Sequence, residues 1–233
     1  MGNWWGCCVM INGTPSLLSG LGDALRTISR SNVLTNPDRF FSELSESEVD
    51  LMTPVGIVLI WAIFNAINIV MAGVLLIRSF PDNAALSGIA IAVLVVPEIV
   101  MSFILWFIWA VAFYTVSMCF KGNGSFKRCL EFTGYGFIPI IAASVIRLAV
   151  SMVVLLTVEF PAESMELLAD ALMQNSLVRM IPVITCLFGL WSAYIGIFGV
   201  KHARKISTRD ALITVGVPGV IAIVYYLNEV YMI

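Results

Sequence analysis

The sequence predicts an all-α integral membrane protein with five transmembrane helices and an N-terminal interfacial amphipathic helix. Composition is the first reason, because 60% of the 233 residues are hydrophobic and only 12% are charged. So little polar content cannot cover the surface of a soluble globule. The second reason is that runs free of Asp, Glu, Lys and Arg recur along the chain. These runs approach the roughly 20 apolar residues that a helix needs to cross a bilayer.

The chain divides into a cytoplasmic N-terminal segment, residues 1–50, and a five-helix membrane domain, residues 51–233. The first residues lack the charged start, the long apolar stretch and the cleavage site of a signal peptide, so we do not expect one. A short helix is expected near the end of this segment, at about 36–45, because Asn36 is a typical N-cap and Pro37 a typical first helical residue.

The apolar face of this short helix suggests what it does. Three side chains form that face: Phe40, Phe41 and Leu44. A helix with one apolar face can lie on a membrane with that face among the lipids. We therefore expect these side chains to be interfacial anchors on the inner membrane surface.

The membrane domain is expected to contain five spans. Their approximate bounds are 52–77, 97–120, 132–158, 178–200 and 211–228. The second span needs an argument, since the apolar region at 83–120 is broken once by Glu98. At about 1.5 Å per residue this region is too long for one crossing and too short for two with a turn. Pro97 followed by an acid is typical of a helix start, so we expect the span to begin there and residues 83–96 to form an interfacial or re-entrant segment.

Basic residues indicate the orientation. The N-terminal segment and the loops after the second and fourth spans together hold ten Lys and Arg residues, whereas the opposite side holds Arg78 and Arg179. Lys and Arg accumulate on the cytoplasmic side of membrane proteins. We expect a multi-pass protein, located in the cell membrane, with its N-terminus in the cytoplasm and its C-terminus outside.

One stretch, "KGNGSFKRCLEFTGYGFIP" at 121–139, raises the question of an anion-binding loop. Glycines beside a lysine can present backbone N–H groups to a phosphate. The spacing and the context of a P-loop are absent, however, so we favour a bend between two helices. In this interpretation residues 122–124 make the turn, Ser125 caps a short cationic helix, and Gly134 and Gly136 let the third span pack closely against its neighbours.

Two ionisable residues fall within predicted membrane segments, Glu98 in the second span and Arg147 in the third. Such residues are costly in a bilayer and usually face a partner or a water-filled cavity. Counting along the helices places both in the outer half of the membrane, so they form a candidate intramembrane functional pair. The alternative is that each reaches the outer interface independently. On the first span, Asn65 and Asn68 share a face and are expected to support helix packing.

No residue pattern indicates catalysis, and the protein is not expected to be an enzyme. His202 is the one histidine of the chain and lies in a basic loop, without cysteines or carboxylates at zinc spacing around it. Serine chemistry lacks a histidine base in the membrane domain. We therefore expect no catalytic residue, no metal and no cofactor.

Taken in order, "NPDRFF", "DLMTP", "GNGSFK", "TGYGFIP" and "KHARKISTRDAL" resemble the Yip1 family of polytopic membrane proteins, over about 34–228. The positions that carry the resemblance are Asp50, Leu51, Pro54, Gly122, Gly124, Gly134, Tyr135 and Pro139. Met52 and Thr53 depart from the Asp-Leu-Tyr-Gly-Pro motif of eukaryotic members. The long proline-rich tail of many eukaryotic members has no counterpart here, so the chain looks like a compact prokaryotic, archaeal-type member.

The resemblance implies a five-helix membrane domain with a cytoplasmic N-terminus. In eukaryotic relatives it implies a role in vesicle traffic with small GTPases as partners. Membrane lipids and a cytoplasmic protein are the expected partners here. A net charge of -2 gives no attraction to nucleic acid. The sequence is compatible with a homo-oligomer.

Two functions from different classes remain. The first is a non-enzymatic scaffold or adaptor in membrane organisation or a trafficking-like process. The alternative is a small-molecule or lipid transporter or scramblase that uses Glu98 and Arg147. We favour the first, because no internal repeat can be aligned between the spans.

Overall fold

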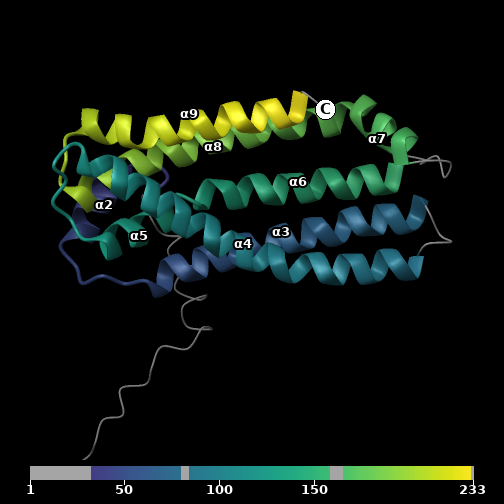
Figure 1. Cartoon of the computed structure of the whole chain (residues 1–233), viewed down its shortest axis with the longest axis horizontal. Coiled ribbons are helices and arrows are strands. Elements are labelled where there is room, and N and C mark those ends of the chain that lie inside the picture. Colours follow the sequence, from purple (N-terminus) through teal and green to yellow (C-terminus); the bar gives the residue numbers. More distant parts are fainter. Residues whose placement is uncertain (1–32, 80–83, 158–164, 232–233) are drawn as a thin grey trace, which may run out of the picture.

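The computed structural model describes residues 33–79, 84–157 and 165–231. Within these ranges the chain forms helices joined by turns, and no strand (Figure 1). The helices are α2 (Pro37–Ser45), α3 (Met52–Ser79), α4 (Ala84–Met118), α5 (Phe126–Tyr135), α6 (Ile138–Thr157), α7 (Met165–Gln174), α8 (Ser176–Arg204) and α9 (Thr208–Tyr231). Five segments are long and apolar enough to cross a membrane, with α5 and α6 counted as one. The all-α fold class and the five candidate spans are thus confirmed.

The long helices α3, α4, α6, α8 and α9 lie side by side along the bundle (Figure 1). α3 packs against α4 and α6, and α8 packs against α6 and α9. The short helices α2 and α5 gather at one end, while α7 lies at the other (Figure 1). We call the first of these the capped end; it consists of α2, the segment at 46–51, α5, the turn at 119–125, the last turn of α8, and the α8–α9 turn with the first residues of α9.

α4 is longer than the sequence predicts. It runs without interruption from Ala84 to Met118, with Pro97 inside it. The expected helix start at Pro97 is therefore wrong, and the described residues before it continue the same helix. A proline removes one backbone hydrogen bond, but in an apolar span neighbouring helices and small local adjustments tolerate that loss. The helix is about 52 Å long, which exceeds the roughly 30 Å hydrocarbon core.

The third span is a pair of helices rather than one. α5 ends where the backbone N–H groups of Gly136 and Phe137 donate to the carbonyls of Thr133 and Gly134, each at 3.1 Å. α6 then begins at Ile138, with Pro139 in its first turn, where a missing N–H costs nothing. The predicted turn and short cationic helix are confirmed, since Ser125 accepts a hydrogen bond from the backbone N–H of Arg128 at the start of α5.

The N-terminal amphipathic helix is confirmed as α2, with Asn36 as its N-cap. Its apolar face packs on the protein, however. Phe41 is completely buried and its ring centroid lies 4.9 Å from that of Phe132, while Phe40 lies 5.2 Å from Tyr135. Leu44 packs against the same core. The role of lipid anchor expected for this face does not fit these contacts, because the side chains that were expected to enter the lipid pack against the protein core instead.

The described basic residues gather as the sequence predicts. Those at the capped end lie on α2, on the turn before α5, on α5 and around the α8–α9 turn: Arg39, Lys121, Lys127, Arg128, Lys201, Arg204, Lys205 and Arg209. Arg78 and Arg179 belong to the opposite ends of α3 and α8. Arg26 and Arg30 lie outside the described residues. That the capped end faces the cytoplasm stays a prediction from this asymmetry.

Candidate functional site

Several of the motif positions meet where α3 begins. The Asp50 carboxylate accepts hydrogen bonds from the backbone N–H of Met52 and from the hydroxyl of Thr53, both at 2.8 Å, and so caps α3. Pro54, one turn on, contacts Gly134 of α5. A Cβ added at Gly134 would lie 2.6 Å from the Cβ of Pro54, so any side chain larger than hydrogen would push α3 and α5 apart. The close packing expected of Gly134 is confirmed.

A buried ion pair joins α5 to the segment between α2 and α3. Glu131 is 0% exposed, and its carboxylate accepts from Arg128 at 2.7 Å and from the backbone N–H of Asp50 at 3.1 Å. Arg128 also donates to the backbone carbonyls of Leu44 and Ser47. Both carboxylate oxygens are therefore occupied, which a buried charge requires. Sequence reasoning missed this pair, although the three-residue spacing of Arg128 and Glu131 on a helix was a signal for it.

Arg204 fixes the glycine-rich turn to the end of α8. It is 2% exposed, and its guanidinium group donates to the hydroxyl of Ser117 at 2.8 Å and to the backbone carbonyls of Gly122 and Gly124. Its Cζ atom lies 4.1 Å from the ring centroid of Tyr114, a cation–π contact. Sequence reasoning counted Arg204 among the basic loop residues, because nothing local in the sequence separates a buried arginine from a solvated one.

The glycines of this turn are required for close approach. A Cβ on Gly124 would lie 1.6 Å from the backbone oxygen of Ala203, and one on Gly122 would lie 3.1 Å from the Nε atom of Arg204. The residue with a positive φ angle in this turn is Lys121, at 56°. The turn is thus filled by the protein's own arginine, which supports the bend over the anion-binding loop.

Besides its apolar packing, α2 is held on α8 by the carboxylate of Asp38. An Asp38 oxygen lies 2.6 Å from the Lys201 Nζ atom and 2.7 Å from the Nε2 atom of His202. Hydrogen bonding to Lys201, and then to His202, holds the pKa of Asp38 below its usual value. The histidine thus belongs to a contact between two helices.

The predicted intramembrane residues lie on two different helices, both of which pack against α3. Arg147 of α6 donates to the side-chain oxygen of Asn65 of α3 at 2.6 Å. Ser144 donates to the same oxygen, and Asn68 donates to the Ser144 carbonyl at 3.3 Å, so the packing role of the two asparagines is confirmed. Glu98 lies on α4, which also packs against α3. Coupling between Glu98 and Arg147 stays a prediction.

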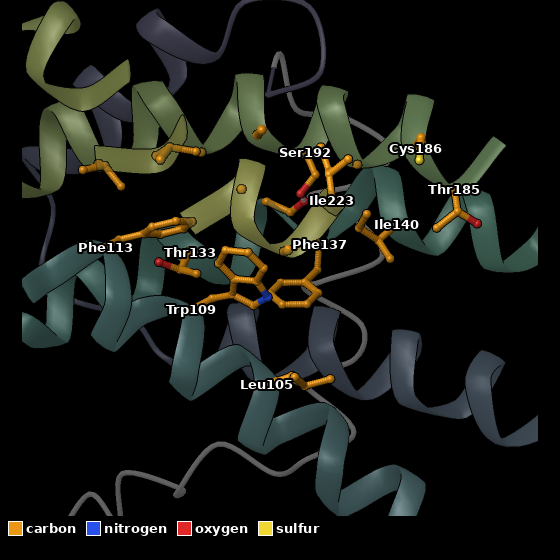
Figure 2. A pocket seen from close by; sticks show the side chains of 18 of the residues that line it. Leu105, Trp109, Phe113, Thr133, Phe137, Ile140, Thr185, Cys186, Ser192 and Ile223 are labelled. Atoms are coloured by element: carbon orange, nitrogen blue, oxygen red, sulfur yellow. Dashed lines mark hydrogen bonds between the residues drawn. The ribbon is translucent and has the colours of Figure 1, made fainter. Parts of the chain in front are cut away.

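A cavity of about 310 Å³ opens between the long helices (Figure 2). Aromatic rings from α3, α4 and the α5–α6 turn line one part of it: Trp61, Trp109, Phe113 and Phe137. Side chains and glycines of α8 and α9 line the rest. Glu98 and Arg147 are not among its lining residues.

Five apolar spans with a layer of short helices at one end define a polytopic helical membrane protein. The Yip1 domain model matches residues 31–227, so the chain belongs to the Yip1 domain family. The chain is also similar to the uncharacterized protein MJ0794 of the archaeon Methanocaldococcus jannaschii, with 36% identity over 119 residues, which cover 51% of this chain and 84% of the relative. No solved structure matches the chain. The resemblance seen in the motifs is confirmed.

Proposed function

We propose that this protein is a non-enzymatic scaffold or adaptor that recruits a cytoplasmic protein at its capped end. One observation carries the proposal: three chain segments distant in sequence are fixed there by contacts of Glu131, Arg204 and Asp38, which makes one preorganised surface. A preformed surface binds a partner without the entropy cost of ordering loops.

The exposed charges of this surface suggest how a partner is recognised. The basic ones include Arg39, Lys121, Lys127, Lys205 and Arg209, and the acidic ones, on and directly after α2, include Glu43, Glu46, Glu48 and Asp50. Rim charges of this kind steer a partner of complementary charge and set its orientation. We therefore expect a partner whose contact surface carries charges of both signs, complementary to these.

Two charge reversals test the adaptor role. Lys127→Glu with Arg209→Glu changes the exposed face of the capped end, and Arg179→Glu is the matched control at the opposite end of α8. Proteins cross-linked to each variant in intact cells are compared. We expect a partner that the parent and the control retain and the capped-end variant loses. The same set of cross-linked proteins from all three would contradict an adaptor surface at this end.

The orientation is tested separately, because the proposal needs the capped end in the cytoplasm. With single cysteines, a membrane-impermeant thiol reagent is expected to label Lys127→Cys from the cytoplasmic side and Glu166→Cys from outside. Labelling of Lys127→Cys from outside would invert the topology and remove the cytoplasmic surface from consideration.

The transporter or scramblase alternative receives less support. A path for charged substrates would be expected to include Glu98 or Arg147, and the cavity includes neither. Movement of lipids keeps some support from the apolar character of the cavity. An assay with fluorescent phospholipids in proteoliposomes decides between the adaptor and the scramblase. A rate of lipid translocation above that of protein-free vesicles would favour the scramblase over the adaptor.

A further inference from the structure

Three hydroxyl groups line the cavity between the long helices, and the hydrogen of each is already used in a hydrogen bond within the protein. Thr133, Thr185 and Ser192 each donate to a backbone carbonyl, those of Cys129, Ile181 and Gly136. The remaining lining residues are aliphatic, aromatic or glycine, and the polar groups they add are the thiol of Cys186 and the indole N–H groups of Trp61 and Trp109. A ligand with polar groups would lose hydrogen bonds with water on entering and gain few in return. The walls therefore favour a hydrocarbon.

The shape of the cavity favours a chain. Along α8 its lining extends from Thr185 to Val200, which at 1.5 Å per residue is about 22 Å. One leaflet of the hydrocarbon core is about 15 Å thick. An acyl chain that spans one leaflet is therefore shorter than the lining of the cavity along α8.

The two sides of the cavity also suit a chain. Figure 2 shows Phe113, Trp109 and Phe137 on the side of α4 and the α5–α6 turn, facing α8 and α9. Small residues lie on the α8 and α9 side, Gly189 and Gly219 among them, and nothing lies within 4 Å of a Cβ built on either glycine. The glycines on this side therefore leave space opposite the rings that a side chain would otherwise fill.

We propose that this cavity is a binding site for one hydrocarbon tail of a membrane lipid. The occupant follows from the apolar walls, from the length of the lining along α8, and from the position of the cavity among helices long and apolar enough to span a membrane, where lipid tails are the surrounding medium. The site is independent of the adaptor role, since none of the contacts that hold the capped end lines it.

A phospholipid with a photoreactive diazirine in one acyl chain tests the site. The full chain is reconstituted in phosphatidylcholine vesicles containing this lipid, irradiated, and mapped by peptide mass spectrometry. Labelling is assigned to single residues, and that of the lining residues Trp109, Phe113 and Ile223 is measured relative to the exposed Leu156 of α6. We expect these lining residues to be labelled in excess of this lipid-facing reference. Labelling equal to the reference would overturn the proposal.

Glycine variants provide matched controls. Gly219→Phe fills the cavity, whereas Gly216→Phe adds the same ring three residues away on α9, also into open space but outside the lining. We expect about tenfold less relative labelling in the first, as when about two chain methylenes lose apolar contact, and none of this loss in the second. Equal labelling of both variants would overturn the site.

A second cavity-filling variant and a second photoreactive probe complete the test. If Gly219→Phe fails to fold, Gly189→Phe fills the cavity from α8, where a Cβ also meets open space. A diazirine-bearing free fatty acid replaces the phospholipid in a parallel experiment. Cavity labelling by the free acid alone would show a site for a soluble fatty acid, and would overturn a site for a membrane lipid.

Discussion

Replacing Arg204 by Met should destabilise the capped end more than any exposed substitution there. The change removes the donor for two backbone carbonyls, those of Gly122 and Gly124, and for the hydroxyl of Ser117. Each buried acceptor left without its donor costs about 1–3 kcal/mol, so the two carbonyls together cost about 2–6 kcal/mol of unfolding free energy. For a chain of this size, that corresponds to a fall of about 4–24 °C in Tm.

Thermal unfolding of the purified protein in detergent, followed by tryptophan fluorescence, measures this loss. Arg209→Met is the matched control, because Arg209 is exposed on the adjacent helix and its replacement should cost less than about 0.5 kcal/mol. Arg204→Lys should fall between the two, since an ammonium group cannot reach all three acceptors of a planar guanidinium.

A local measurement separates this network from a general loss of packing. The backbone N–H of Asn123 donates to the Arg204 carbonyl at 2.9 Å, so hydrogen exchange at the 121–124 turn should accelerate in Arg204→Met. A Tm within about 2 °C of Arg209→Met, together with unchanged exchange at this turn, would refute the reasoning.

Three other predictions concern the ion pair of Asp38, the close approach at Gly134, and the two intramembrane residues. The lowered pKa of Asp38 means that its contribution to the docking of α2 is present above about pH 4 and is lost as the pH falls further. Amide hydrogen exchange in α2, corrected for intrinsic rates, should therefore accelerate below about pH 4. In Asp38→Asn, α2 should exchange fast at every pH, with no acceleration on acidification. Gly134→Leu should cost about 1–3 kcal/mol or more through its clash with Pro54, measured by Tm against Gly216→Leu, which meets open space; equal Tm values would contradict the close approach. For Glu98→Leu and Arg147→Met, a double-mutant cycle followed by thermal unfolding should give a coupling energy above about 0.5 kcal/mol if the two charges form a pair, and strict additivity would exclude it.

The sequence predicts the helices of this protein well where the signal lies in consecutive residues, such as an apolar run or a helix cap. Five apolar runs indicated five spans, and Asn36 and Ser125 indicated the starts of α2 and α5. The start of the second span was misjudged, because Pro97 has the same local signature at the first turn of a helix as inside a helix whose neighbours tolerate it.

The contacts at the capped end are harder to predict from the sequence. Arg204 and its acceptor Ser117 are 87 residues apart, and Asp50 and Glu131 are 81 apart. Each is a common surface residue type, so pattern alone does not distinguish its burial. The amphipathic pattern of α2 gave the helix and its apolar face, but such a pattern fits a membrane surface and a protein groove equally well.

The docking of α2 on α8 has a consequence for biosynthesis. Asp38 lies 163 residues before its partner Lys201. At about 5–20 residues per second, a ribosome needs roughly 8–33 s to pass from one to the other. During that interval Phe40 and Phe41 have already been synthesised, whereas the α8 surface that later holds α2 has not. The capped end therefore cannot close while the first three spans are being made, and α2 takes its final position only after α8 has been synthesised.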